Sequence, residues 1–246
     1  MGTSSAYGGS SSWNSAVSTA IADAESHSAS VSSSFARELG RALARGDSFG
    51  RSYPVPDLLA SRRSGNGSST AGQGRESGGT PPFTRDAARG ALVFAAVEAV
   101  EAGDAAVLTE LGVDLRQLQG LTGRELFAEL ARLILGSPSH PDDLAVSQAV
   151  LATLASGEPG ASLSDRIAQF VAALAWQRAA VQLASNRSWR DRAKTTIRAF
   201  EAKAKGWIRA RVTQIADVLA NRSAQEVANY ASDLAARACH EFSEEL

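Results

Sequence analysis

The chain has 246 residues, of which 44% are hydrophobic and 21% charged, and its net charge is -1 at pH 7. These fractions are typical of a globular protein, and the near-zero charge excludes a general electrostatic attraction to nucleic acid or acidic membranes. The single cysteine, Cys239, excludes an intramolecular disulfide and suits a reducing cytoplasm. No apolar run approaches the roughly 18 residues that span a bilayer, and the N-terminus lacks a signal peptide. We therefore expect a cytoplasmic protein without membrane contact.

Residues 1–12 consist largely of Ser and Gly. They cannot bury enough apolar surface to offset the entropy lost on ordering, so a flexible tail is predicted. Gly2 is small enough to permit removal of Met1, which leaves a free glycine amine. An α-amine has a pKa near 8, so a useful fraction is the neutral nucleophile at physiological pH. Gly2 is therefore a candidate modification site, although many Ser/Gly-rich starts share this composition by chance. Myristoylation is not expected, because Ala6 stands where that motif requires Ser or Thr.

Apolar residues recur at helical spacing within residues 13–48, namely Val17, Ile21, Ala24, Val31, Phe35, Leu39 and Leu43. They predict an amphipathic helix that needs a partner surface, because its many serines weaken it in isolation. Disorder of this segment is the alternative. Residues 49–80 contain helix-breaking prolines and then a long stretch without large apolar side chains. A flexible linker is predicted there.

Residues 81–246 show repeated signals for helix starts. Five sites have Ser or Thr followed three residues later by Asp or Glu, the capping-box pattern: Thr122/Glu125, Ser139/Asp142, Ser162/Asp165, Ser188/Asp191 and Ser223/Glu226. With the apolar spacing they predict helices over 84–102, 123–135, 141–155, 163–185, 189–220 and 224–244, and a short turn near 105–111. The predicted fold is all-α, a bundle of about six helices behind a flexible, partly helical tail rich in Ser, Gly and Ala.

No catalytic, nucleotide-binding or metal-binding motif occurs in the sequence. We therefore expect no enzyme activity, no metal and no cofactor. Cys239 and His240 are adjacent, and neighbouring side chains on a helix point about 100° apart, so they are poorly placed to share one metal. A buried thiol beside a surface imidazole is expected instead.

Basic residues are concentrated between Arg187 and Arg211, where nine Lys or Arg face only two acidic residues. One interpretation is a phosphate-binding stripe, with Arg198, Lys205 and Arg209 as candidate contacts for nucleic acid. The alternative is the solvated face of a long amphipathic helix, balanced by acidic neighbours.

Two parts of the sequence resemble the QatB family, whose members belong to the four-gene bacterial Qat anti-phage defence systems. The first part is Met1-Gly2-Thr3-Ser4 followed by Tyr7-Gly8-Gly9. The second comprises residues 111–125 and the helix pair predicted over 163–220. The family tends to have a proline-rich segment after its start, whereas residues 10–49 contain no proline. Because of this departure, the resemblance implies neither how extended the tail is nor whether it docks on its own domain.

The resemblance implies a modification substrate rather than an enzyme. A QueC-like partner ordinarily uses ATP to activate a carboxylate on a deazaguanine, which ammonia then attacks. In the defence system the Gly2 amine would replace ammonia and form an amide with a 7-deazaguanine-type base. The resemblance further implies that the helical domain docks the ATPase and the TatD-like nuclease of the same system, and that the tail residues next to Gly2 are recognised by the partner enzyme: Thr3, Ser4, Tyr7, Gly8 and Gly9. A nucleic-acid-binding adaptor and a structural scaffold are the alternatives.

Overall fold

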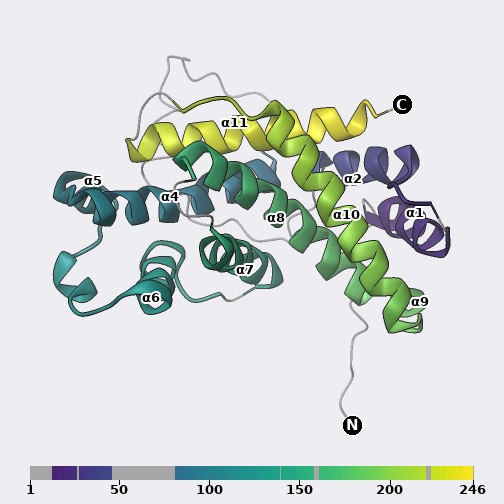
Figure 1. Ribbon diagram of the computed structural model, residues 1–246, viewed down its shortest axis with the longest axis horizontal. Coiled ribbons are helices and arrows are strands. Elements are labelled where there is room, and N and C mark those ends of the chain that lie inside the picture. Colours follow the sequence, from purple (N-terminus) through teal and green to yellow (C-terminus); the bar gives the residue numbers. More distant parts are fainter. Residues whose placement is uncertain are drawn as a thin grey trace, which may run out of the picture.

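The computed structural model describes residues 13–26, 28–45, 81–138, 140–157, 161–219 and 223–245. Every regular element in these ranges is a helix, which confirms the predicted all-α class (Figure 1). The elements are α1 (Asn14–Glu25), α2 (Ser33–Arg45), α4 (Pro82–Ala102), α5 (Ala105–Glu110), the 3-10 helix η3 (Leu115–Leu118), α6 (Gly123–Leu135), α7 (Pro141–Ser156), α8 (Leu163–Ser185), α9 (Arg187–Arg190), α10 (Lys194–Ile215) and α11 (Ala224–Ser243). None of these helices is both long and apolar enough to cross a membrane.

The centre of the bundle is α4, which packs against α11, α8, α6 and α7 (Figure 1). Its proline at the first turn has the fixed φ that starts a helix. Fourteen of its residues are buried, so it is covered on almost every side. Gly90 allows the closest approach to α8, since a Cβ there would lie 2.2 Å from Cζ of Phe170. The core is therefore built around the α4–α8–α11 contacts.

The capping pattern correctly predicted the capping residues of two helices, α8 and α11. Ser162 forms a complete capping box with Asp165 at the start of α8, and Ser223 accepts from the Glu226 N–H at the start of α11. Thr122 precedes α6 as predicted but makes no side-chain cap. The predicted ranges of α6 and α8 coincide with the observed ones.

Two capping predictions were wrong. The cap of α7 is His140, whose Nδ1 accepts from the backbone N–H of Asp142 at 3.3 Å, while Ser139 lies outside the described residues. The helix predicted over 189–220 is divided into α9 and α10 and ends at Ile215. Asn186, rather than Ser188, caps α9 by accepting from the Trp189 N–H. Arg192 then donates to the Ser188 carbonyl and closes the short turn.

The region predicted as one helix over 13–48 contains two helices, α1 and α2 (Figure 1). Serines and a buried carboxylate make the turn between them: Ser26 Oγ donates to the Asp23 carbonyl, and Asp23 Oδ2 accepts from the Ser32 N–H, both at 2.8 Å. α2 packs against α11, and α1 packs against α2 and α10. Phe35 and Leu39 are fully buried. The described parts of this region are thus ordered and belong to the bundle.

Gly40 sets the separation of α2 and α11. A Cβ at this position would lie 2.7 Å from both the Cys239 carbonyl oxygen and the Ser243 backbone nitrogen. Because both atoms belong to a helix backbone, Gly40→Ala is expected to lower the free energy of unfolding by about 1–3 kcal/mol, the usual cost of overpacking. Urea denaturation measures this loss.

Gly206 provides the matched control for that measurement. It lies within α10, and a Cβ there would meet nothing within 4 Å. Gly206→Ala is expected to stabilise the protein by about 0.5–1 kcal/mol, because alanine loses less backbone entropy in a helix. Equal effects of the two substitutions would contradict the close packing of α2 on α11.

Candidate functional site

The proposed modification site, Gly2, and the proposed recognition residues Thr3, Ser4, Tyr7, Gly8 and Gly9 lie outside the described residues. Trp13 is the first described residue and directly precedes α1, and its side chain is buried in the core. The point where the N-terminal segment joins the bundle is therefore fixed by packing.

Much of the basic stripe between Arg187 and Arg211 is engaged by the chain itself. Arg192 pairs with Glu25, and Lys203 donates to the carbonyls of Asp23 and Ser28 at 3.2 and 3.4 Å. Arg211 pairs with two acidic residues at the end of the chain, Glu241 and Glu245. These contacts fit the alternative of a charge-balanced helix surface for this part of the stripe.

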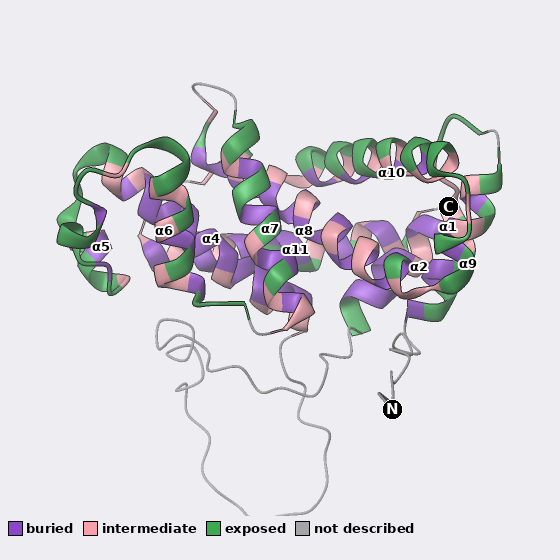
Figure 2. Ribbon diagram, turned by 90° about the horizontal axis from the view of Figure 1, so that it is seen from below, coloured by how far each residue is buried: buried purple, intermediate pink, exposed green. Residues whose placement is uncertain are grey.

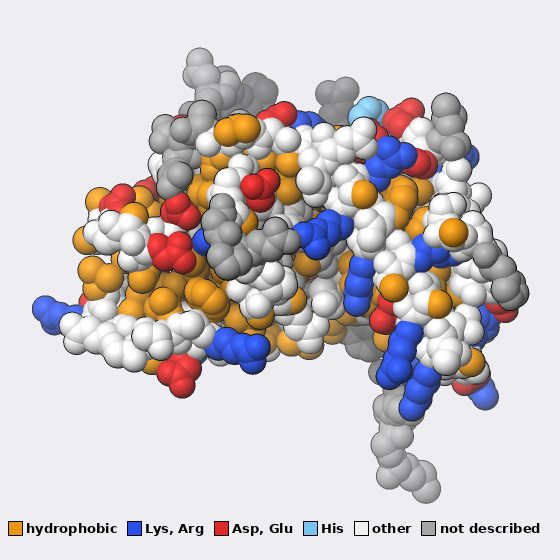
Figure 3. Space-filling model, in the orientation of Figure 1, with side chains coloured by type: hydrophobic (Ala, Val, Ile, Leu, Met, Phe, Trp, Pro, Cys, Tyr) orange, Lys and Arg blue, Asp and Glu red, His pale blue; other side chains and the backbone are white. Residues whose placement is uncertain are grey.

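The three candidate phosphate contacts, Arg198, Lys205 and Arg209, are all exposed residues of α10, and Figure 2 shows that much of this helix is exposed. Arg198 and Arg209 make no hydrogen bond or ion pair with any described residue. Lys205 Nζ lies 3.9 Å from Glu201 Oε2 and 5.4 Å from the centroid of the Trp176 ring. On the face shown in Figure 3, the Lys and Arg side chains gather mainly over the half that contains α9 and α10.

A groove brings two of these three cations together. It has a volume of about 300 Å³ and runs between α7, α8 and α10. Lys205 and Arg209, one turn apart on α10, line it, whereas Arg198 does not. The remaining lining residues come from α7 (Ala152, Thr153, Ser156) and from one face of α8 (Gln169, Ala172, Ala173, Trp176, Gln177).

The amide groups of Gln169 and Gln177 in this groove were not predicted from the sequence. Gln169 and Gln177 are partly exposed, but most of their neighbours in α8 are buried, so the sequence pattern predicts only a core helix. The available signal was a polar residue on each side of the pair Ala172 and Ala173, whose small side chains leave space beside the helix. The side-chain amides, the guanidinium and the ammonium group together make the groove a site rich in hydrogen-bond donors.

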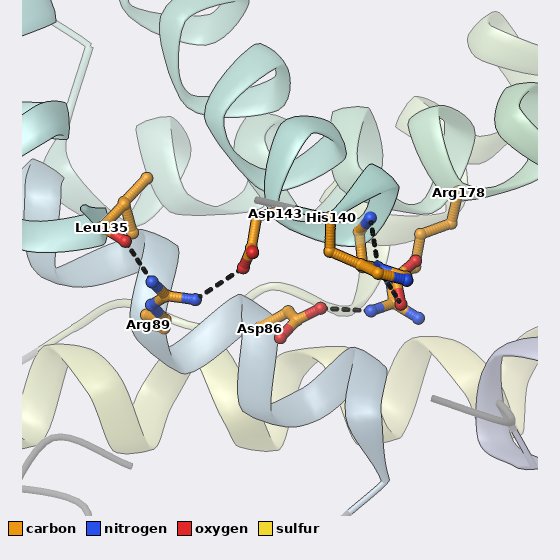
Figure 4. A network of polar contacts seen from close by, with 7 residues as sticks. Asp86, Arg89, Leu135, His140, Asp143 and Arg178 are labelled. Carbon is orange, nitrogen blue, oxygen red and sulfur yellow. Dashed lines mark hydrogen bonds and ion pairs between the residues drawn. The ribbon is translucent and has the colours of Figure 1, made fainter. Parts of the chain in front are cut away.

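A buried polar network lies at the junction of α4, α7 and α8 (Figure 4). Arg178 donates to Asp86, and both side chains are about 95% buried. Arg89 binds Asp143 at 3.0 Å and also donates to the Leu135 carbonyl at the end of α6. Burial raises the pKa of Asp86, and the Arg178 guanidinium opposes this shift. Since the network joins α4 to α6, α7 and α8 and does not line the groove, its evident role is to fix the packing of these helices.

Cys239 is buried, as the sequence predicts, and the adjacent His240 is exposed. Burial raises the pKa of the thiol to about 12, although the Arg178 guanidinium acts in the opposite direction. At pH 8 the thiolate fraction in the native protein is then roughly a thousandfold below that of a free cysteine. Native Cys239 is expected to react with iodoacetamide at least about a thousandfold more slowly than in 6 M guanidinium chloride. Similar rates by mass spectrometry would show that the thiol is accessible.

Within the described ranges, no group of three or more His, Cys, Asp and Glu side chains is arranged to hold a metal ion. The sites that the structure does assemble are the donor-rich groove and the buried network around Asp86. Comparison of the chain with protein-family models, with curated proteins and with solved structures found no match.

Proposed function

We propose that this chain is a non-catalytic, cytoplasmic component of a bacterial anti-phage defence system similar to Qat. Its Gly2 amine, exposed by removal of Met1, accepts a 7-deazaguanine-type base from a QueC-like enzyme. The observation that carries the proposal is the start Met1-Gly2-Thr3-Ser4 with Tyr7-Gly8-Gly9. The α-helical domain is the carrier of this acceptor.

The chemistry requires an amine that is neutral, unhindered and able to reach another protein's active site. A glycine α-amine has a pKa near 8 and carries no side chain beside it. The eleven residues from Gly2 to Ser12 have a maximum length of about 40 Å when extended. Since Trp13 is buried, the domain holds one end of this segment while the amine is presented at the other.

The proposed step is an acyl transfer. The partner enzyme activates the carboxylate of the deazaguanine with ATP, the Gly2 nitrogen attacks the activated carbonyl carbon, and a C–N bond forms as the activating nucleotide leaves. The amine loses a proton in the process. The proposed recognition residues are Thr3, Ser4, Tyr7, Gly8 and Gly9. The helical domain docks the ATPase and the TatD-like nuclease of the same system.

Co-expression with the QueC-like enzyme tests the proposal. Intact-mass measurement is expected to show the protein without Met1 and with the added mass of the base, and fragmentation of the N-terminal peptide is expected to place that mass on Gly2. An unmodified Gly2 in the presence of active enzyme and its precursor would refute the proposal. If deletion of residues 2–12 left phage defence intact, the role of a structural scaffold would be favoured instead.

A nucleic-acid-binding adaptor is the second candidate, and the exposed, unengaged guanidinium groups of Arg198 and Arg209 on α10 favour it. Binding to phosphates releases counterions, so affinity would fall steeply as salt is raised. Charge reversal at Arg198, Lys205 and Arg209 would abolish binding to nucleic acid. Affinity that does not depend on salt would exclude this function.

A further inference from the structure

The clefts of the described structure differ in how far their charged groups are already engaged. A cleft of about 670 Å³ between α1 and α10 contains Arg192 and Lys203. Arg192 pairs with Glu25 across it, and Lys203 donates to two backbone carbonyls. In the groove between α7, α8 and α10, by contrast, Arg209 is unengaged among the described residues. The groove is therefore the better candidate for a ligand.

We infer that the groove between α7, α8 and α10 binds a small phosphorylated molecule, such as a phosphate monoester or a diphosphate. This inference is independent of the function proposed for Gly2. The described lining contains two cations and no carboxylate. An anion bound there would gain charge-assisted hydrogen bonds, which are stronger than those between neutral groups.

The donors converge from two helices. Lys205 and Arg209 approach from α10, while Gln169 and Gln177 lie on the opposite wall, on α8. Neither glutamine amide has a hydrogen-bond partner among the described residues. Lys205 is held over the Trp176 ring and only loosely paired with Glu201, at 3.9 Å. Four donor side chains thus surround one hollow without being satisfied by one another.

The shape of the groove favours a small ligand over an extended nucleic acid. Its volume of about 300 Å³ is at the lower end of the range for small-molecule sites. Arg198, which would extend a phosphate track along α10, lies about 10 Å from Lys205 along the helix axis. Glu201 stands between them in the sequence and is paired with Lys205. A nucleic-acid backbone following α10 would meet this carboxylate.

Titration calorimetry with inorganic pyrophosphate and with AMP, using the full chain, tests the inference. Saturable binding at one site is expected for the wild-type chain. Arg209→Glu is expected to weaken it by at least about tenfold, in line with the energy of a hydrogen bond to a charged group. The matched control is Arg198→Glu, which makes the same charge change on the same helix outside the groove and is expected to alter affinity by less than about twofold.

Ala173→Leu provides a second test without a change of charge. Ala173 lines the hollow and is partly exposed, so a leucine there fills the groove while the helix is retained, and loss of binding is expected. Circular dichroism melting of each variant verifies that the fold persists. If neither pyrophosphate nor AMP binds to the wild-type chain, the inference is overturned. Equal losses for Arg198→Glu and Arg209→Glu, with tighter binding of a 20-nucleotide single strand, would overturn it in favour of nucleic acid.

Discussion

Gly2→Pro is expected to abolish the mass increase that co-expression with the QueC-like enzyme gives, and phage defence with it. Proline offers only a secondary amine inside a rigid ring, so the nucleophile is hindered and its φ is fixed. Gly2→Leu is expected to have the same result by a different route, because a bulky second residue retains Met1 and displaces the amine by one position. Intact mass reports the modification, and plaque counts report defence.

Matched variants separate loss of the amine from loss of the tail. Gly2→Ala retains a small residue and a primary amine, and Ser11→Ala changes the tail without touching its start; both are expected to be modified. The rate of modification is expected to rise with pH up to about 8 and then level off, because the neutral amine is the nucleophile. Full modification of Gly2→Pro and Gly2→Leu would show that the acceptor is another group.

The sequence predicted the helices whose ends carry local chemistry. The boundaries of α6 and α8 match the predicted ranges, because a capping residue or a positive-φ glycine marks each of three ends: Ser162 caps α8, and Gly123 and Gly136 bound α6 with φ values of 54° and 74°. These signals act within three or four residues, so they can be recognised without knowledge of the tertiary fold.

Predictions failed where a distant contact decides the local structure. The division of α9 from α10 has no proline or glycine to mark it; it depends on Asn186 and on the packing of Trp189 against Phe200, whose ring centroids are 5.4 Å apart. The separation of α1 from α2 depends on a buried carboxylate, Asp23, that accepts from the backbone nine residues later. The Asn186 cap is a local signal that the prediction overlooked, whereas the contact between Trp189 and Phe200 and the bond from Ser32 to Asp23 have no signature within three or four residues.

The candidate site was predictable only in part, for the same reason. The i,i+4 spacing of Lys205 and Arg209 places them on one face of a helix. The glutamines opposite them become neighbours only when α8 and α10 pack together. The pairing of Asp86 with Arg178, 92 residues later, was equally invisible, because nothing in the sequence links two polar residues on separate helices.

The two single substitutions in the pair formed by Asp86 and Arg178 are expected to differ in how the stability they remove depends on pH. Asp86→Asn leaves the Arg178 charge buried without an ionic partner, and a guanidinium cannot release its proton. The free energy of unfolding of the Asp86→Asn variant is expected to be lower by about 3–5 kcal/mol, as for other broken buried ion pairs. This loss is expected to depend little on pH between 5 and 8. Urea denaturation at several pH values measures both properties.

Arg178→Met leaves the opposite partner, and a carboxyl group can become neutral. Burial already raises the pKa of Asp86 above its ordinary value of 3.8 while Arg178 lowers it, so without Arg178 the pKa rises further. The folded state then holds a proton that the unfolded state releases, and stability falls as pH rises above about 4, by up to about 1.4 kcal/mol per pH unit, until the folded-state pKa is passed. The double variant Asp86→Asn with Arg178→Met removes both charges and is expected to be more stable than Asp86→Asn alone. Equal, pH-independent losses in both single variants would show instead that the pair contributes only its hydrogen bond to stability, and that the packing of α4 and α8 tolerates a buried charge.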